Sequence, residues 1–377
     1  MRLSVSISDS ATAGQGYPID IVPELPGAPT ATVLREVLSP KARRLLVVSD
    51  DNVAPLYAGE LEAALAAAGY LVATIVLPAG EATKSMATIE RVLAAAFNHK
   101  LSRSDAMVAL GGGVVGDITG FAAAIFQRGI DVVQIPTSLL AQVDSSVGGK
   151  TGVNHASGKN LIGAFWQPRA VVASQAVLAT LPAREVRCGL AEAVKHAYIA
   201  DAELLVRIVR DTDALMQLEP TATARLVAAC CRIKSGVVAA DPREDPIAGR
   251  RAVLNFGHTF GHAYEKLLGY GRWTHGEAVA VGMVWAARLS ERLGVASPGL
   301  ERAVSVTLRA LGLPADPEAA DLPRLPDLIE AAKGDKKGDA SEVRFVLLAA
   351  IGQPVLRRLP WTDVALALAD STREGVA

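Results

Sequence analysis

The first half of the chain alternates short apolar runs with segments of helical periodicity, and this alternation restricts the fold more than any other feature. The apolar runs end in turn residues: "RRLLVVSD", "LVATIVLP", "DAMVALGGG" and "DVVQIPT". The intervening segments, such as "AGELEAALAAAGY" and "ATIERVLAAAFNHK", have apolar residues at helical spacing. Because strands that alternate with helices form parallel βαβ units, we predict an α/β domain of the kind that binds nucleotides.

The second half consists mainly of long amphipathic segments. They include "AREVRCGLAEAVKHAYIAD", "TATARLVAACCRIKSGVVAAD" and "HGEAVAVGMVWAARLSERLG", and only one late run, "VRFVLLAAIG", resembles a strand. The change falls near "LATLPARE", where Pro182 can open a helix. We therefore predict an α/β domain over 1–180 and a mainly helical domain over 181–377. A chain of this length usually forms about two domains, which agrees with this division.

Composition excludes several classes of protein. A net charge of −1 argues against a surface that coats nucleic acid. No apolar run approaches the ~18 residues of a membrane span, and the N-terminus has no long apolar signal segment. The three cysteines, Cys188, Cys230 and Cys231, are too few for a disulfide framework. We expect a cytoplasmic protein with buried thiols that has neither a nucleic-acid nor a membrane partner.

A glycine-rich turn joins a predicted strand to a predicted helix in "VALGGGVVGDITGFAAAIF". Gly111, Gly113 and Gly116 have the G-x-G-x-x-G spacing that cradles a pyrophosphate at a helix N-terminus. A tight turn without a ligand is the alternative, but the flanking strand and helix favour a nucleotide. Asp131 follows at the distance of a ribose ligand, which is a weaker indication.

A polar segment, "SLLAQVDSSVGGKTGVNHASGKNLIGAF", directly follows the strand "DVVQIPT". It sets Asp144, Lys150, Asn154, Lys159 and Asn160 among glycines. Loops at the carboxyl ends of parallel strands bind ligands. A solvated loop would not require two lysines among glycines that admit a ligand to the backbone, so the segment favours an anionic ligand.

The chain has six histidines, and three of them, His258, His262 and His275, are close in sequence, with Asn255 and Glu265 in the same region. His258 and His262 share a helix face, as in two-histidine zinc sites. The alternative is a pair of core histidines bonded to backbone carbonyls. The concentration of histidines favours a metal, and spacing alone nominates His258 and His262 together.

Two other groups of charges have open interpretations. Glu192 and Lys195 in "GLAEAVKHAYIAD" share a helix face, either as a surface ion pair or as a partly buried carboxylate that requires a cation or a metal. Lys333, Lys336 and Lys337 in "KGDKKGDASEVRFVLL" form either a solvated turn or cations for a phosphate or carboxylate.

Nine segments resemble, in the same order, the 3-dehydroquinate synthases of the sugar phosphate cyclase superfamily. They are "DDNVAPLY", "GEATKS", "GGGVVGD", "PTSLLAQVDSSVGGKTGVNH", "GKNLIGAF", "AEAVK", "LNFGHTFGHA", "HGEAV" and "DKKGDASEVRFVLL". The resemblance implies a Rossmann-like parallel-sheet domain that holds NAD, followed by a mainly α-helical domain that holds a divalent metal. The metal is usually zinc, and cobalt, manganese or iron also suit such ligands.

The resemblance also implies roles for individual residues. The metal ligands are Glu192, His258 and His275, so His262 contacts substrate instead of completing the pair nominated from spacing. The NAD contacts are Asp50, Asn52, Glu81, Lys84, Gly113, Val114, Asp117, Thr137, Ser138, Thr180, Leu181 and Glu185. The catalytic and substrate-binding residues are Asp144, Lys150, Lys159, Asn160, Lys195, Lys234, Arg251, Asn255, His262 and Lys336, with Arg128 reaching the phosphate across a homodimer interface.

The implied reaction converts 3-deoxy-arabino-heptulosonate 7-phosphate to 3-dehydroquinate and phosphate, a carbon–oxygen lyase step of the shikimate pathway that leads to chorismate and the aromatic amino acids. NAD transiently oxidises the substrate, phosphate is eliminated, the hydride returns, and an intramolecular aldol step closes the ring. The substrate has two anionic groups, a carboxylate and a phosphate. The residues expected to bind the carboxylate end are Lys150, Arg251, Lys336 and His262, and those expected to bind the phosphate are Lys159, Asn160, Lys195 and Arg128.

Three alternatives stay open. Related cyclases act on other sugar phosphates such as sedoheptulose 7-phosphate, although His262 and Lys336 favour a carboxylate-bearing substrate. Polyol dehydrogenases share the fold, but a neutral polyol does not require the lysine-rich segment. A non-catalytic NAD-binding module is the third.

Two departures from the family pattern are a loop about three residues longer before Arg251, which makes its pairing with Lys234 less secure, and Ser138 in place of a frequent threonine.

Overall fold

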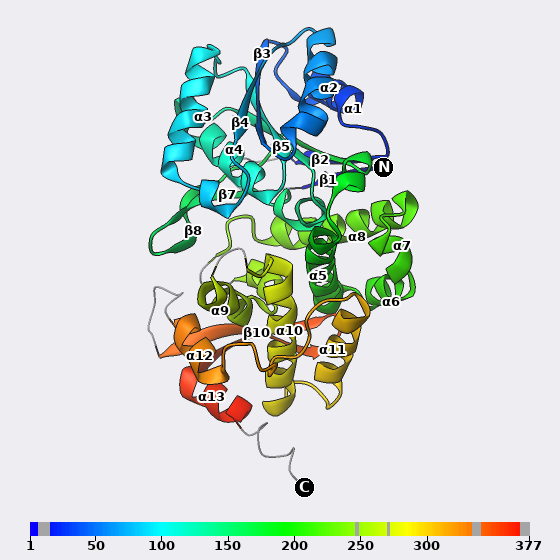
Figure 1. Ribbon diagram of the computed structural model, residues 1–377, viewed down its shortest axis with the longest axis vertical. Coiled ribbons are helices and arrows are strands. Elements are labelled where there is room, and N and C mark those ends of the chain that lie inside the picture. Colours follow the sequence, from blue (N-terminus) through cyan, green and yellow to red (C-terminus); the bar gives the residue numbers. More distant parts are fainter. Residues whose placement is uncertain (7–15, 246–248, 270–271, 334–340, 370–377) are drawn as a thin grey trace. The chain divides into compact units, whose positions relative to one another are not determined.

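The computed structural model describes residues 1–6, 16–245, 249–269, 272–333 and 341–369. The chain forms two compact units (Figure 1). Unit 1 comprises Met1–Pro182 and Leu218–Arg243, and unit 2 comprises Ala183–Gln217 and Glu244–Ala377. The chain first passes from unit 1 to unit 2 after Pro182, two residues beyond the boundary predicted at 180. The sequence pattern does not indicate that residues 218–243 belong to unit 1.

Unit 1 contains a seven-stranded sheet with the order β1-β2-β9-β6-β5-β3-β4. Neighbouring strands pair in parallel except β1 with β2. The strands are β1 (Arg2–Val5), β2 (Tyr17–Val22), β3 (Arg44–Asp50), β4 (Leu71–Leu77), β5 (Ala106–Gly111), β6 (Asp131–Pro136) and β9 (Ala170–Ser174). The predicted parallel sheet is confirmed, and the four predicted strands coincide with β3, β4, β5 and β6.

Each face of this sheet has its own helical cover. Leu45 and Val47 of β3 pack with α1 (Gly27–Val37) and α2 (Ala54–Ala67). Leu46 and Val48, which point the other way, pack with α3 (Met86–Asn98) and α4 (Gly113–Ile125). Figure 1 shows these two pairs of helices on opposite sides of the strands. Burial on both faces explains why the central strands are continuous apolar runs and do not alternate with polar residues.

The polar segment after β6, predicted as a loop, is largely an antiparallel hairpin. It begins with a short π-helical turn, η3 (Ala141–Ser145), and continues as β7 (Lys150–His155) and β8 (Gly158–Phe165). The strands approach closely because glycines face each other: a Cβ at Gly163 would lie 2.1 Å from the carbonyl oxygen of Thr151. The glycines that suggested a loop therefore serve strand pairing.

Helix α8 (Pro220–Ala240) completes unit 1. It packs against β1, β2 and η3, although it follows helices of unit 2 in the chain. Its apolar face includes Leu226, Val227 and Val238, all buried. Amphipathicity predicts that such a face is covered, but it does not say by which part of the chain.

Unit 2 is mainly helical, as predicted. Its helices are α5 (Ala183–Ala200), α6 (Ala202–Arg210), α7 (Thr212–Met216), α9 (His258–Leu268), α10 (His275–Arg292), α11 (Leu300–Ala310), α12 (Leu325–Lys333) and α13 (Trp361–Ala369), with a 3-10 segment η5 (Arg250–Asn255). The predicted late strand is β10 (Glu342–Ala350), and it pairs with β11 (Gln353–Pro360), which the sequence did not indicate. Phe260, Trp285 and Phe345 join α9, α10 and β10 in one core.

Glycines set the crossing of α9 and α10. A Cβ at Gly282 would lie 2.0 Å from the carbonyl oxygen of Gly257 and 2.8 Å from the backbone nitrogen of Gly261. Gly257 has a φ of 81°, in the left-handed region, and it immediately precedes α9. This contact fixes the beginning of α9 against α10, and those two helix segments carry His258 and His275.

No helix in the described part of the chain has the length and apolar character needed to span a membrane. Cys188, Cys230 and Cys231 are buried and form no disulfide. Burial raises the pKa of the Cys188 and Cys231 thiols to about 12, so both are protonated at neutral pH.

We expect Asp105→Asn to destabilise unit 1 by about 1–3 kcal/mol at pH 7. The buried Asp105 carboxylate accepts hydrogen bonds from the backbone N–H groups of Arg43, Arg44 and Ser102, at 2.8, 2.8 and 2.7 Å. Burial opposes ionisation, but these bonds outweigh it and lower the pKa of Asp105. The stabilisation is therefore present above the unfolded-state pKa and is lost as the pH falls through the folded-state pKa. Urea unfolding at pH 7 and in acid measures it, and a difference that persists undiminished in acid would contradict the assignment.

Candidate active site

The residues expected to contact NAD follow the carboxyl ends of the parallel strands in unit 1. Asp50 ends β3 and is followed by Asn52; Glu81 and Lys84 follow β4; Gly113, Val114 and Asp117 follow β5; Thr137 and Ser138 follow β6; Thr180 and Leu181 follow β9. These strand ends share one edge of the sheet. Since β4 and β5 lie on opposite sides of β3, the switch point where such sheets bind ligands is between β3 and β5. Glu185 instead lies on α5 in unit 2.

The glycine-rich turn lies at this switch point. Gly111 ends β5, Gly112 caps α4, and the N–H of Thr137 donates to the carbonyl oxygen of Gly111 at 3.0 Å. The first N–H groups of α4 therefore point out of the sheet edge, the arrangement that binds a pyrophosphate. Asp131 begins β6 at the opposite edge and pairs with Arg169 at 3.3 Å, so its position does not suit a ribose ligand.

Lys84 is buried and lies at the centre of a polar cluster. Its ammonium group donates to Asp117 Oδ2 at 2.7 Å and to Asn160 Oδ1, and it lies 3.9 Å from Glu81 Oε1. Asn154 joins Glu81 (2.8 Å) to the backbone of Asn160 (2.9 Å). Burial raises the pKa of Asp117, and the Lys84 charge opposes that rise. Residues expected at NAD and a residue expected at substrate, Asn160, are thus directly bonded.

The other expected substrate residues of unit 1 lie on the hairpin, on η3, on α8 and at the end of the 3-10 turn η2 (Phe126–Arg128). Lys234 donates to the Asp144 carbonyl at 2.7 Å and pairs with its carboxylate at 2.8 Å. Lys150, at the beginning of β7, is exposed, and Lys159 on β8 is half-buried. Arg128 has a φ of 69°, an unusual backbone conformation for a non-glycine residue.

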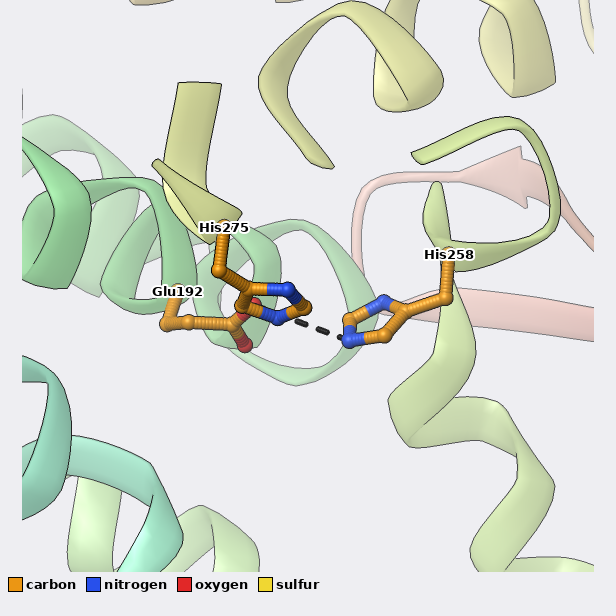
Figure 2. Close-up of side chains that lie close together, drawn as sticks. All are labelled: Glu192, His258 and His275. Atoms are coloured by element: carbon orange, nitrogen blue, oxygen red, sulfur yellow. Dashed lines mark ion pairs between the residues drawn. The ribbon is translucent and has the colours of Figure 1, made fainter. Parts of the chain in front are cut away.

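Glu192, His258 and His275 come together in unit 2 from three helices (Figure 2). Their ligand atoms lie within 4.8 Å of one another. Glu192 lies on α5 and is fully buried, His258 is the first residue of α9, and His275 is the first residue of α10. Two imidazole nitrogens and one carboxylate oxygen form the donor set of catalytic zinc sites, which leave a further position open. The residues present therefore fit a divalent metal.

Both histidines direct the same nitrogen at the carboxylate. Nε2 of His258 lies 3.7 Å from Glu192 Oε1, and Nε2 of His275 lies 3.4 Å from the same oxygen. Nδ1 of His258 lies 3.2 Å from the carbonyl oxygen of Phe256, and Nδ1 of His275 lies 3.4 Å from Glu265 Oε2. Each Nδ1 thus has an acceptor for its proton, which leaves the Nε2 lone pairs for a metal.

The environments of the two histidines differ. Burial lowers the pKa of His258 to about 3 and keeps this imidazole neutral. Burial also opposes protonation of His275, but its bonds to Glu192 and Glu265 outweigh burial and raise its pKa to about 10. Metals bind neutral imidazole, so metal binding would release the proton from His275.

His262 lies beside this cluster without belonging to it. Its ring centroid is 5.4 Å from that of His258 and 6.2 Å from that of His275. The pair nominated from spacing does share the face of α9, but His258 has its near ligand partners on α5 and α10. The geometry therefore favours the set implied by the resemblance.

Three of the four other expected residues lie in the described part of the chain. Lys195 is buried and pairs with Glu192 one helical turn earlier. Arg251 is buried in η5, and Asn255 at the end of η5 lies 3.5 Å from Glu244. Lys336 lies outside the described residues.

Two contacts that hold the cluster were not identified from the sequence. The N–H of Gly276 donates to the Sγ of Cys188 at 3.2 Å, and a Cβ at Gly276 would lie 2.6 Å from the Cα of Cys188, so α10 begins directly against α5. No sequence signal indicates this contact. The second is the contact of Glu265 with His275; the sequence places Glu265 near the histidines, and its position two helical turns after His258, on the same face of α9, is the signal that could have indicated it.

Comparisons with known proteins agree with this geometry. Two family models, described as 3-dehydroquinate synthase N-terminal and C-terminal, match residues 74–188 and 189–338. A structure of 2-deoxy-scyllo-inosose synthase with carbaglucose-6-phosphate, NAD+ and Co2+ matches over 100% of both chains, with 25% identity and a TM-score of 0.85. ValA, a 2-epi-5-epi-valiolone synthase from Streptomyces hygroscopicus subsp. jinggangensis 5008 with NAD+ and Zn2+, covers 97% of this chain and 99% of its own, with 28% identity and a TM-score of 0.83.

A probable glycerol dehydrogenase from Sinorhizobium meliloti 1021 shares the fold at 19% identity and a TM-score of 0.64, over 95% of this chain and 98% of its own. The two family models together span most of the chain, and they meet between residues 188 and 189, within α5, the helix that contains Glu192. The chain belongs to the 3-dehydroquinate synthase family, within the sugar phosphate cyclases.

Proposed function

We propose that the protein is a 3-dehydroquinate synthase, which uses NAD and a divalent metal, zinc or cobalt, to convert 3-deoxy-arabino-heptulosonate 7-phosphate to 3-dehydroquinate and phosphate. The observation that carries the proposal is the cluster of Glu192, His258 and His275, with Lys195 and His262 beside it, in a chain that both family models match. The NAD+ and metal ions in the structures of the inosose and valiolone synthases support the same cofactors for this chain.

When bound, the metal supplies a Lewis acid for the substrate hydroxyl and NAD supplies a hydride acceptor. Glu192, His258 and His275 hold the metal, and the residues along the carboxyl edge of the sheet hold NAD. Lys195 balances the charge of Glu192, and His262 provides a further donor or acceptor beside the cluster. The later steps involve bonds within one bound molecule, so correct positioning supplies much of the rate.

The substrate anions determine the roles of the basic residues. We infer that Lys150, Arg251, Lys336 and His262 bind the carboxylate end, and that Lys159, Asn160, Lys195 and Arg128 bind the phosphate. In this proposal Arg128 reaches the phosphate from the second subunit of a homodimer. The thiols of all three cysteines are buried and form no disulfide, which suits the reducing cytoplasm, where the shikimate pathway would operate.

Cyclisation of another sugar phosphate is the second candidate. The observation that favours it is the end-to-end similarity to an inosose synthase and a valiolone synthase. Both candidates use NAD without consuming it, whereas a polyol dehydrogenase would release NADH. The exposed Lys150 and half-buried Lys159 on one hairpin argue for an anionic substrate over a neutral polyol.

The test is phosphate release by metal-loaded enzyme with NAD below the substrate concentration, while NADH absorbance is recorded. The substrates are 3-deoxy-arabino-heptulosonate 7-phosphate, sedoheptulose 7-phosphate and glucose 6-phosphate. We expect phosphate in large excess over NAD with the first compound, without accumulation of NADH. Phosphate release from only the second or third compound would select another cyclase reaction, and stoichiometric NADH from polyols would reject the cyclase proposal.

A further inference from the structure

Glu265 is a buried carboxylate that no step of the proposed reaction uses. It lies on α9, and its side chain is 6% exposed. Its Oε2 lies 3.4 Å from Nδ1 of His275, the first residue of α10. Burial of a carboxylate is costly unless the charge is paired or hydrogen-bonded, so its position against a histidine of the cluster requires an explanation.

The contact determines which nitrogen of His275 is available to a metal. A neutral imidazole carries one proton, on either Nδ1 or Nε2. In the neutral ring, a proton on Nδ1 has Glu265 as its acceptor, 3.4 Å away, and the lone pair of Nε2 is then on the side of Glu192, also 3.4 Å away. With the proton on Nε2, the ring would present no lone pair to the cluster. A carboxylate on Nδ1 also makes the other nitrogen a stronger ligand.

His258 provides an internal comparison. Its Nδ1 lies 3.2 Å from a backbone carbonyl, that of Phe256, so its tautomer is set by the chain itself without a charge. The Nδ1 of His275 instead has its acceptor, the Glu265 carboxylate, on another helix, α9. The close packing of α9 on α10 at Gly257, Gly261 and Gly282 fixes the distance across which Glu265 acts.

The other contacts of the first turn of α10 do not determine the tautomer of His275. Thr274 and Glu277 form a capping box, and Arg184 binds the Glu277 carboxylate at 2.7 and 2.9 Å. These contacts place the backbone of His275, but none of them touches its ring nitrogens. The orientation of the imidazole therefore depends on Glu192 on one side and Glu265 on the other.

We propose that Glu265 is a positioning residue for the metal: it holds His275 as an Nε2 ligand and strengthens the metal's binding. The inference rests on the metal site of the proposed function and does not depend on which sugar phosphate is the substrate. Glu265 contacts the ring of His275 and acts on the metal through that ring.

The experiment is a titration of metal-free protein with Co2+, followed by the d–d absorption of the bound ion. Glu265→Leu removes both the charge and the acceptor. Glu265→Gln keeps the size and an acceptor oxygen but removes the charge. Loss of such an outer partner typically weakens metal affinity 10–100-fold, so we expect a Kd about 10–100-fold higher for the leucine variant, with the glutamine variant between it and the wild type.

The matched control is Glu318→Gln, which neutralises a carboxylate of unit 2 that pairs with Arg288 away from the histidines. It should bind Co2+ like the wild type. Affinities of both Glu265 variants within about twofold of the wild type, well below the usual effect of such a loss, would overturn the inference, as would an equal loss in the control. If the leucine variant does not fold, the glutamine variant decides by the same criterion. Failure of the wild type to bind Co2+ would reject the metal site itself, and with it the inference.

Discussion

His258→Ala is expected to abolish tight metal binding and to lower kcat/KM for phosphate release by about a thousandfold or more. A Lewis acid stabilises developing charge in the transition state by several kcal/mol, and each ~1.4 kcal/mol corresponds to a factor of ten in rate. His258 contributes one of the three donor atoms that lie within 4.8 Å of one another. Removal of its ring leaves Glu192 and His275, which are too few ligands to hold zinc firmly.

His258 is the most informative ligand to remove because its loss should spare the fold. Burial keeps the ring neutral, with its pKa lowered to about 3, so alanine leaves no uncompensated charge. Metal content after desalting and phosphate release at saturating NAD are the two measurements. His99→Ala, which alters a half-buried histidine bonded to the Leu71 carbonyl in unit 1, is the control and should retain both metal and activity. Full metal content and wild-type turnover in His258→Ala would refute the site.

The central strands and most long helices were predictable because local rules determine them. The apolar runs that became β3, β5 and β6 are mostly buried on both faces, β4 at the sheet edge is only partly buried, and all four runs end in glycine, proline or aspartate. The hairpin of β7 and β8 was not predictable in this way, since Gly152 and Gly163 serve strand pairing in a segment whose composition is typical of a loop. Strand β11 contains Pro354, Arg357 and Arg358, which obscure its pattern.

The metal-ligand cluster was likewise only partly predictable from local sequence spacing. Spacing identifies His258 and His262 because they are one helical turn apart, but Glu192 and His275 come from other helices, and only tertiary packing joins them. The sequence singled out Glu192 and His275 separately, and only the resemblance to a family joined them with His258 as one ligand set. Periodicity likewise predicted that α8 buries a face, although its return to unit 1, where Lys234 binds Asp144, depends on contacts distant in sequence.

Lys195→Met is expected to destabilise unit 2 of the metal-free protein by about 3–5 kcal/mol, the usual cost of leaving one charge of a buried pair uncompensated. Lys195 is 1% exposed, Glu192 is 0% exposed, and the two side chains pair one turn apart on α5. A bound divalent cation supplies positive charge at the same carboxylate. The destabilisation should therefore be smaller with saturating zinc than without it. The measurement is urea unfolding followed by tryptophan fluorescence, since Trp273, Trp285 and Trp361 lie in unit 2.

A double-mutant cycle with Glu192→Gln separates the pair from its surroundings. Each single substitution in the metal-free protein removes one partner of the Lys195–Glu192 pair and leaves the other behind, whereas the double variant removes both charges of the pair, so we expect it to be more stable than the sum of the single effects implies by at least about 1 kcal/mol. Additivity within ~0.5 kcal/mol would show that the two groups act independently. The cycle with zinc present asks a different question, because Glu192→Gln also weakens the metal site. Zinc should then rescue Lys195→Met and fail to rescue Glu192→Gln, and this contrast would show that Lys195 occupies the electrostatic role of the metal when the metal is absent.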